Sequence, residues 1–310
     1  MRKVRRRRPR CAMRPSYAAH EILVGPARGR PALWRLVAGL VLVALIAMGL
    51  NAVFGGLARL AAPEFWRETL RNPALLGSHP VALLVLLASF GFVALGVALA
   101  ARLLQQRAPA GLVGPLPLAV RQFWRVFRLL LVLAAVVMLL PPWDYGEPLV
   151  QNMAPGRWLL LLPLSLGAVL VQTATEELLF RGYIQQSLAA RFAHPAVWML
   201  LPSALFAAGH YLPAQAGDNA VLIALWSGLF GVLMADLTAR AGTLGPAIAV
   251  HFANNVVSLL IVSLPDGLSG LALFTLPYEM SDTTVLRGWL AVDFMLMLLG
   301  WLTARLAIRA

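Results

Sequence analysis

The sequence has a single cysteine, Cys11, and a single lysine, Lys3. One cysteine excludes an intramolecular disulfide and any cysteine-based metal cluster. Charged residues of both signs are also scarce, at 13% of 310 residues, about half the share found in soluble domains. Hydrophobic residues make up 60% of the chain, and the mean hydropathy is +0.77. This composition predicts an all-α, polytopic transmembrane helix bundle.

Acidic residues are few, at 13 against 26 basic ones, and the basic excess is concentrated in the run Arg5-Arg6-Arg7-Arg8. No short apolar core with a small-residue cleavage site follows this run, so the pattern is not that of a signal peptide. We expect residues 1–32 to form a basic cytoplasmic tail that contacts anionic membrane lipid rather than nucleic acid.

About eight apolar runs approach the length of a membrane-spanning helix. They are Leu33–Phe54, Pro80–Leu103, Phe123–Leu140, Trp158–Leu188, Pro195–Tyr211, Val221–Leu237, Leu244–Leu264 and Gly288–Ala307. Arginines are concentrated in the N-terminal tail and in alternate loops, which predicts that both termini are cytoplasmic. We place the protein in the inner membrane of a prokaryote. Residues 33–120 are predicted to form N-terminal transmembrane helices, and residues 121–310 a C-terminal bundle.

The fourth apolar run contains two adjacent carboxylates, Glu176 and Glu177, and Arg181 follows four residues after the second. Ionisable groups at membrane depth are costly and usually functional. On a helix Glu177 and Arg181 share a face, whereas Glu176 points about 100° away. We therefore expect Glu177 and Arg181 to form a structural pair and Glu176 to be the unpaired, reactive carboxylate.

Two later runs add imidazoles and a carboxamide. The fifth contains Phe206 and His210, and the seventh contains His251 and Asn255 on one helical face. A carboxylate with an imidazole can activate water as a general base, and a second imidazole and an amide N–H can stabilise an oxyanion. Two histidines and a glutamate (Glu176, His210 and His251) are also a hydrolytic zinc set, so a metal-dependent site is an open alternative.

The order Glu-Glu-x-x-x-Arg, Phe-x-x-x-His and His-x-x-x-Asn resembles the CPBP intramembrane protease family, which includes the type II CAAX prenyl endopeptidases and bacteriocin-immunity proteins. The resemblance covers about residues 158–264. It implies that Glu176 and His210 activate water, that His251 and Asn255 form the oxyanion site, and that Phe206 lines the pocket. It implies a glutamic or metal-dependent endopeptidase acting on a membrane-associated or lipidated peptide, and no cofactor is certain.

Other functions remain open. A non-catalytic membrane scaffold, a transporter, or an immunity protein without protease activity would also place polar residues in apolar helices. Counting along the helices puts Glu176 near the cytoplasmic end of the fourth span and His210 near the outer end of the fifth. The two residues can meet if the fourth span continues well into the cytoplasm, or if the fifth span begins deep in the membrane or bends at Pro202. His20, His79 and His194 lie in or beside loops, and we expect them to be solvated.

Overall fold

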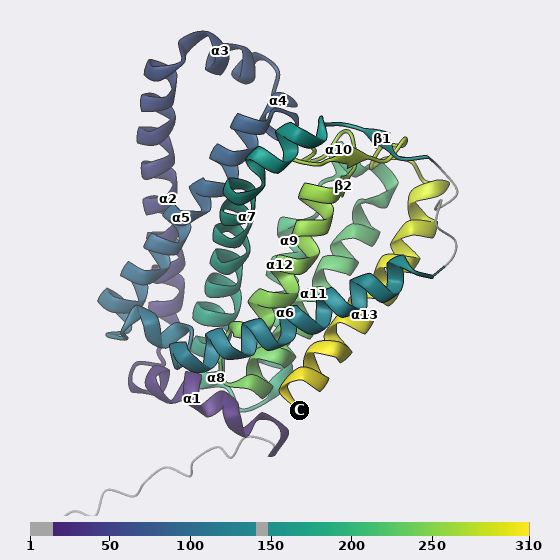
Figure 1. Cartoon of the computed structure of the whole chain (residues 1–310). Helices are drawn as coiled ribbons and strands as arrows, with labels where there is room; N and C mark the ends of the chain where they lie inside the picture. The colour runs from purple at the N-terminus through teal and green to yellow at the C-terminus, as the bar shows by residue number, and fades with distance from the viewer. Residues whose placement is uncertain (1–14, 141–147, 310) are drawn as a thin grey trace, which may run out of the picture.

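The computed structural model describes residues 15–140 and 148–309, and it is almost entirely helical. The arginine run, Cys11 and Lys3 lie outside the described residues. Figure 1 shows long helices side by side, with the described ends of the chain at the same end of the bundle. The predicted all-α helix bundle is confirmed.

The first half of the chain contains short helical turns and three long helices. Its elements are η1 (Pro15–His20), α1 (Glu21–Val24), η2 (Gly25–Gly29), α2 (Leu33–Ala61), α3 (Pro63–Arg71), α4 (Leu75–Ser78), α5 (Pro80–Leu104), η3 (Pro109–Leu112) and α6 (Leu116–Met138). The second half contains the remaining helices and three two-residue strands. Its elements are β1 (Val150–Gln151), α7 (Pro155–Glu177), the π-helix η4 (Leu178–Gln185), α8 (Gln186–Arg191), α9 (Pro195–Gly209), α10 (Pro213–Ala216), η5 (Gly217–Asn219), α11 (Ala220–Ala241), α12 (Gly245–Val256), the π-helix η6 (Val257–Ile261), β2 (Val262–Ser263), β3 (Phe274–Thr275) and α13 (Val285–Ile308).

Proline and histidine set several helix starts. Prolines occupy the first position of α5 and α9, where a missing N–H costs nothing. The side chains of His79 and His194 accept hydrogen bonds from the backbone N–H groups of Val81 and Ala196. These two histidines therefore cap α5 and α9.

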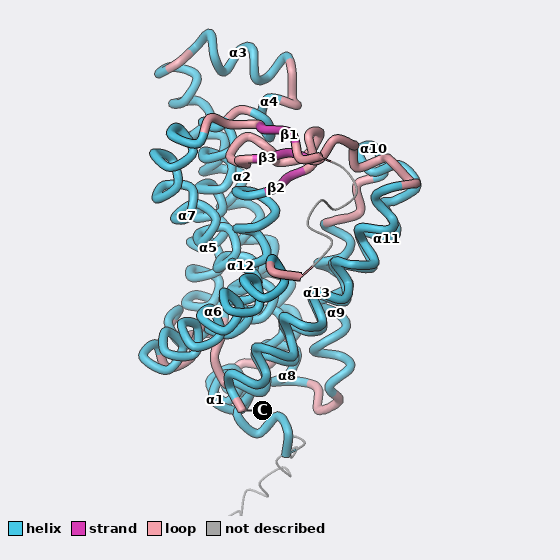
Figure 2. Tube along the Cα trace, turned by 45° about the vertical axis from the view of Figure 1, so that its right-hand side comes forward, coloured by secondary structure: helices cyan, strands magenta, loops and turns pink. Residues whose placement is uncertain are grey.

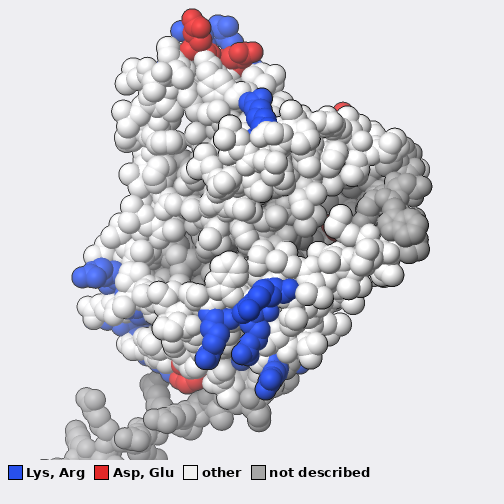
Figure 3. Space-filling view, in the orientation of Figure 1, with Lys and Arg blue, Asp and Glu red and all other residues white. Residues whose placement is uncertain are grey.

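Each of the eight predicted apolar runs lies mainly in helix, although the run Leu244–Leu264 extends past η6 into β2. Five helices of the described chain are long and apolar enough to cross a membrane, namely Leu33–Ala61, Pro80–Leu104, Pro155–Arg191, Pro213–Ala241 and Val285–Ile308. Pro195–Gly209 and Gly245–Ile261 are shorter apolar helices. In Figure 3 charged side chains gather towards the two ends, with a broad uncharged band between them. The chain is an integral membrane protein.

Apolar side chains face outward along the long helices, as lipid contact requires. On α2, for example, Leu45, Met48 and Leu60 are exposed. Where helices approach closely, glycine makes room: a Cβ on Gly245 would lie 2.1 Å from the carbonyl oxygen of Ala119. This contact brings α6 directly against α12.

A three-stranded sheet lies at the end of the bundle opposite the described ends of the chain (Figure 2). β3 lies in the middle, antiparallel to β1 and parallel to β2. Strands this short give no period-2 pattern, and the sequence predicted none of the three.

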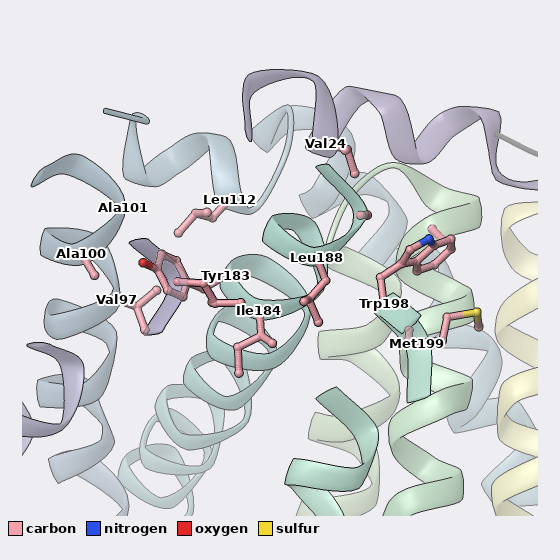
Figure 4. Packing of buried hydrophobic residues seen from close by; sticks show 14 of the residues in the cluster. Val24, Val97, Ala100, Ala101, Leu112, Tyr183, Ile184, Leu188, Trp198 and Met199 are labelled. Carbon is pink, nitrogen blue, oxygen red and sulfur yellow. The ribbon is translucent and has the colours of Figure 1, made fainter. Parts of the chain in front are cut away.

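The N-terminal segment, defined here as η1, α1 and η2, packs onto the bundle. Figure 4 shows Val24 above a cluster that includes Tyr183, Leu188 and Trp198. His20 has no exposed surface, and its ring lies 4.8 Å from that of Trp198. The expectation that His20 is solvated is wrong, because the short helical turn of η1 directs its ring into the bundle. The described half of the predicted tail is thus part of the packed structure.

Candidate active site

The acidic pair lies where α7 changes from an α-helix into the π-helix η4. Nη1 of Arg181 lies 3.0 Å from Oε1 of Glu177, and both side chains are buried. Nη2 of Arg181 also donates to the carbonyl oxygen of Gly231 on α11, at 3.1 Å. The predicted Glu177–Arg181 pair therefore forms and ties α7 and η4 to α11. Short π-helical stretches inside α-helices often occur at functional sites.

Glu176 is the more accessible carboxylate, with 14% of its side chain exposed. Its Oε1 accepts a hydrogen bond from Nε2 of Gln172, one turn earlier on α7, at 2.8 Å. Its buried Oε2 has no hydrogen-bond partner in the described chain and lies 3.4 Å from Nε2 of His251. The expectation that Glu176 has no partner is wrong, since Gln172 and His251 both approach it.

His251 on α12 lies against both carboxylates. Its Nδ1 is 2.8 Å from Oε1 of Glu177, on the opposite side of the ring from Glu176. Two side chains 100° apart on one helix can reach a single imidazole that packs at the seam between them. Because a carboxylate only accepts hydrogen bonds, Nδ1 of His251 carries a proton toward Glu177.

Asn255 joins this group through Gln172. Nδ2 of Asn255 donates to Oε1 of Gln172 at 2.9 Å, and Oδ1 of Asn255 accepts from Asn254 at 3.1 Å. A chain of hydrogen bonds thus runs from Asn255 through Gln172 to Glu176. The sequence analysis missed Gln172, although its position four residues before Glu176 places both on one helical face.

His210 follows the last residue of α9, and Phe206 connects it to the other residues. Nδ1 of His210 lies 2.9 Å from the carbonyl oxygen of Phe206, and the two rings are 4.4 Å apart. Phe206 also contacts the rings of His251, at 6.1 Å, and Phe180, at 5.1 Å. In the described chain no hydrogen bond joins His210 to Glu176. The structure therefore brings Glu176 and His251 together directly, adds Asn255 through Gln172, and adds His210 through Phe206.

The length of the fourth span explains how Glu176 and His210 come to lie at a similar depth in the bundle. The helical stretch continues from α7 to Arg191, well past Glu176, before the turn at residues 192–194. Glu176 lies 16 residues before Phe192, and His210 lies 16 residues after His194. The ring of Phe206, one turn before His210, lies 5.1 Å from the guanidinium carbon of Arg181, four residues after Glu177. Glu176 and His210 therefore lie at a similar level of the bundle.

Charge balance constrains the site. Glu176, Glu177 and Arg181 together carry one excess negative charge when both carboxylates are ionised. An unbalanced charge among buried side chains is costly. His251, whose ring nitrogens lie 3.4 Å from Glu176 and 2.8 Å from Glu177, is the side chain placed to balance this charge.

A zinc set is not formed by the predicted residues. Among the described residues no group of three or more His, Cys, Asp or Glu side chains is arranged to hold a metal ion. Glu176 and His251 approach each other, whereas the imidazole of His210 bonds to its own helix. These three side chains do not fit a hydrolytic metal site in this arrangement.

Comparison with known proteins finds a family model that matches the segment containing this site. Residues 158–257 match the family model described as type II CAAX prenyl endopeptidase Rce1-like. This matched segment, called here the Rce1-like segment, is similar to that family. The match confirms the predicted CPBP resemblance and begins in α7 and ends in η6. The Rce1-like segment contains all seven predicted site residues and Gln172.

A relative in Bacillus subtilis (strain 168), the uncharacterized protein YyaK, is 26% identical over 152 residues. The matched stretch covers 48% of this chain and 48% of YyaK, so it spans about half the length of each. No solved structure matches the chain. The Rce1-like segment and its geometry therefore carry the functional argument.

Proposed function

We propose that this protein is an intramembrane endopeptidase that uses Glu176 to activate water. The observation that supports this proposal most strongly is the hydrogen-bonded set of Glu176, Gln172 and Asn255, with His251 against the carboxylate, within an Rce1-like segment. A reactive carboxylate with two potential oxyanion donors in apolar helices suits peptide hydrolysis at a membrane. The substrate is a membrane-associated or lipidated peptide.

His210 and His251 have different roles in proton transfer. Nδ1 of His210 faces a carbonyl oxygen and therefore carries its proton there, which leaves Nε2 of the neutral ring as an acceptor. Nδ1 of His251 faces Glu177, so a second proton on its ring resides on Nε2 and can be donated. His210 thus assists Glu176 in accepting a proton from water, and His251 donates to the developing oxyanion.

The reaction proceeds in two steps. Glu176 takes a proton from water while the water oxygen attacks the peptide carbonyl carbon. The tetrahedral oxyanion accepts hydrogen bonds from Nε2–H of His251 and Nδ2–H of Asn255, each contributing about 3 kcal/mol. The intermediate then collapses, the C–N bond breaks, and the proton held by Glu176 passes to the leaving amine.

The end of the bundle that holds both described ends of the chain faces the cytoplasm in this proposal, and the membrane is the inner membrane of a prokaryote. Its two described acids, Glu21 and Asp236, are paired with Arg28 and Arg240. This end is therefore basic, as cytoplasmic ends are.

A peptide-cleavage assay tests the proposal. The purified protein in lipid nanodiscs is incubated with a library of membrane-anchored peptides, and products are identified by mass spectrometry. We expect cleavage by the wild type and none by Glu176→Gln, with Glu279→Gln in an exposed loop as the matched control. Because the predicted zinc ligands do not converge, we expect cleavage to survive a metal chelator. Equal cleavage by Glu176→Gln and Glu279→Gln would contradict the proposed role of Glu176.

A further inference from the structure

Three arginines form a stripe along the outward side of α6. Arg121, Arg125 and Arg128 are all exposed, and at 100° per residue they lie within about 60° of the helix circumference. Val126 and Leu130, on the opposite side of α6, are buried. Figure 3 shows a blue patch where Figure 1 draws the first half of α6. This arginine stripe does not belong to the catalytic set.

The positive charge of the stripe is unopposed. Helix α6 contains no acidic residue, and none occurs in the sequence between Glu68 and Asp144. Arg128 donates from Nε to the carbonyl oxygen of Trp124 on its own helix, at 3.1 Å. In the part of the chain that the structure describes, Arg121 and Arg125 form no side-chain hydrogen bond or ion pair. The stripe therefore presents most of its guanidinium donors outward.

The surroundings of the stripe place it at a membrane boundary. Trp124 is 52% exposed on the same side of α6 and provides the amphipathic ring typical of the lipid interface. Farther along α6, Leu131 and Val132 are exposed in a continuous apolar surface. A molecule bound along this side of α6 would contact the arginines at one end and the exposed apolar side chains at the other. Guanidinium groups bind phosphate through paired N–H donors.

We propose that the arginine stripe binds the phosphate headgroups of anionic phospholipids, with their acyl chains along the apolar half of α6. The buried side of α6 connects this surface to the catalytic helix. The rings of Phe123 and Phe127 lie 6.2 and 5.6 Å from that of Phe252, which follows His251 on α12. The lipid surface is thus the outward side of the helix whose inward side packs against α12. Lipid binding at the stripe does not rest on the proposed function.

Native mass spectrometry of the full chain in detergent measures the binding directly. The protein is titrated with phosphatidylglycerol or with phosphatidylcholine of the same acyl chains. We expect the R121Q/R125Q/R128Q variant to bind phosphatidylglycerol on the order of 100-fold more weakly than the wild type, with no change for phosphatidylcholine. The charge-retaining R121K/R125K/R128K variant should keep most of the preference, which separates lost charge from lost folding.

The matched control removes three arginines from the opposite end of the bundle, as R59Q/R67Q/R71Q, and should keep the wild-type preference. Millimolar inorganic phosphate should fail to displace phosphatidylglycerol from the wild type. The proposal is overturned if the stripe and control variants bind phosphatidylglycerol equally, or if inorganic phosphate alone displaces it. Because no peptide is cleaved in this experiment, its result is independent of the protease proposal.

Discussion

At the residue scale, the site depends on one side chain that bridges two others. Gln172 donates to Glu176 and accepts from Asn255, so it fixes both the base and one oxyanion donor. Its side chain is buried, and replacement by a smaller residue would free both partners to rotate. Gln172 is thus a positioning residue in the proposed reaction.

We expect Gln172→Ala to lower kcat about 10- to 100-fold with little change in KM, because displacement of catalytic groups by about 1 Å costs that much. The check is steady-state cleavage of the same peptide by both proteins. Gln151→Ala, in the covering sheet, is the control. An unchanged kcat would mean that Glu176 and Asn255 are positioned by other contacts.

Residue spacing predicted the Glu177–Arg181 pair because that contact is local, within one helical turn. It could not predict that His251 contacts both carboxylates, since this depends on how α12 packs against α7. The tautomers of His210 and His251 likewise follow from partners that sequence spacing does not reveal.

At the element scale, the contact of α12 with α6 determines where His251 and Asn255 lie. Gly245 begins α12 against the backbone of Ala119, and a Cβ there would overlap the carbonyl oxygen. Backbone cannot move aside as a flexible side chain can. The two helices would have to separate.

Gly245→Ala should therefore lower stability by about 1–3 kcal/mol, the usual cost of overpacking. The measurement is thermal unfolding in detergent. Gly167→Ala on α7, where a Cβ meets no atom within 4 Å, provides the matched control and should be neutral or stabilising. Equal melting temperatures for the two variants would contradict this account of the α6–α12 contact.

The N-terminal segment is an element whose docking depends on a neutral histidine. Burial lowers the pKa of His20 to about 3, and the opposing effect of Glu21 is smaller. When the segment is undocked, the pKa returns to about 6.5. Docking is therefore fully stable above pH 6.5 and weakens by up to about 1.4 kcal/mol per pH unit between pH 6.5 and about 3.

Limited proteolysis at pH 7.5 and pH 5 checks this dependence. We expect cleavage within residues 15–29 of the wild type to be at least about 10-fold faster at pH 5, after correction for the protease's own pH profile. His20→Gln, which does not titrate, should show no such acceleration. Equal acceleration of proteolysis at pH 5 in the wild type and in His20→Gln would mean that a titratable group other than His20 controls docking.

At the scale of the whole molecule, charge is segregated between the two ends of the bundle. The end with the sheet and α3 carries most of the described acids, namely Glu64, Glu68, Asp218, Asp266, Glu279 and Asp282. The opposite end carries unopposed arginines, including the stripe on α6. We expect a fluorescent protein fused after Ala310 to fluoresce, and alkaline phosphatase inserted after Asp282 to be active. The reverse pattern would invert the proposed orientation.

Composition and apolar runs predicted the helix bundle and the position of each long helix, because lipid demands continuous apolar segments. Composition did not predict that the N-terminal segment packs onto the bundle. Its arginine-rich context indicates a free tail, whereas His20, Leu23 and Val24 are buried by packing on distant helices. The small sheet was missed because its strands are stabilised by pairing across the chain rather than by a local pattern.

The central claim is that Glu176 activates the water that hydrolyses a membrane peptide. The most direct measurement is the single-turnover cleavage rate of one identified peptide by Glu176→Gln, relative to Glu279→Gln, in the same nanodiscs and at equal concentrations of folded protein. The account predicts a rate lower by about 10³-fold or more, because the amide cannot accept the proton of water. Rates within about threefold of each other would contradict it.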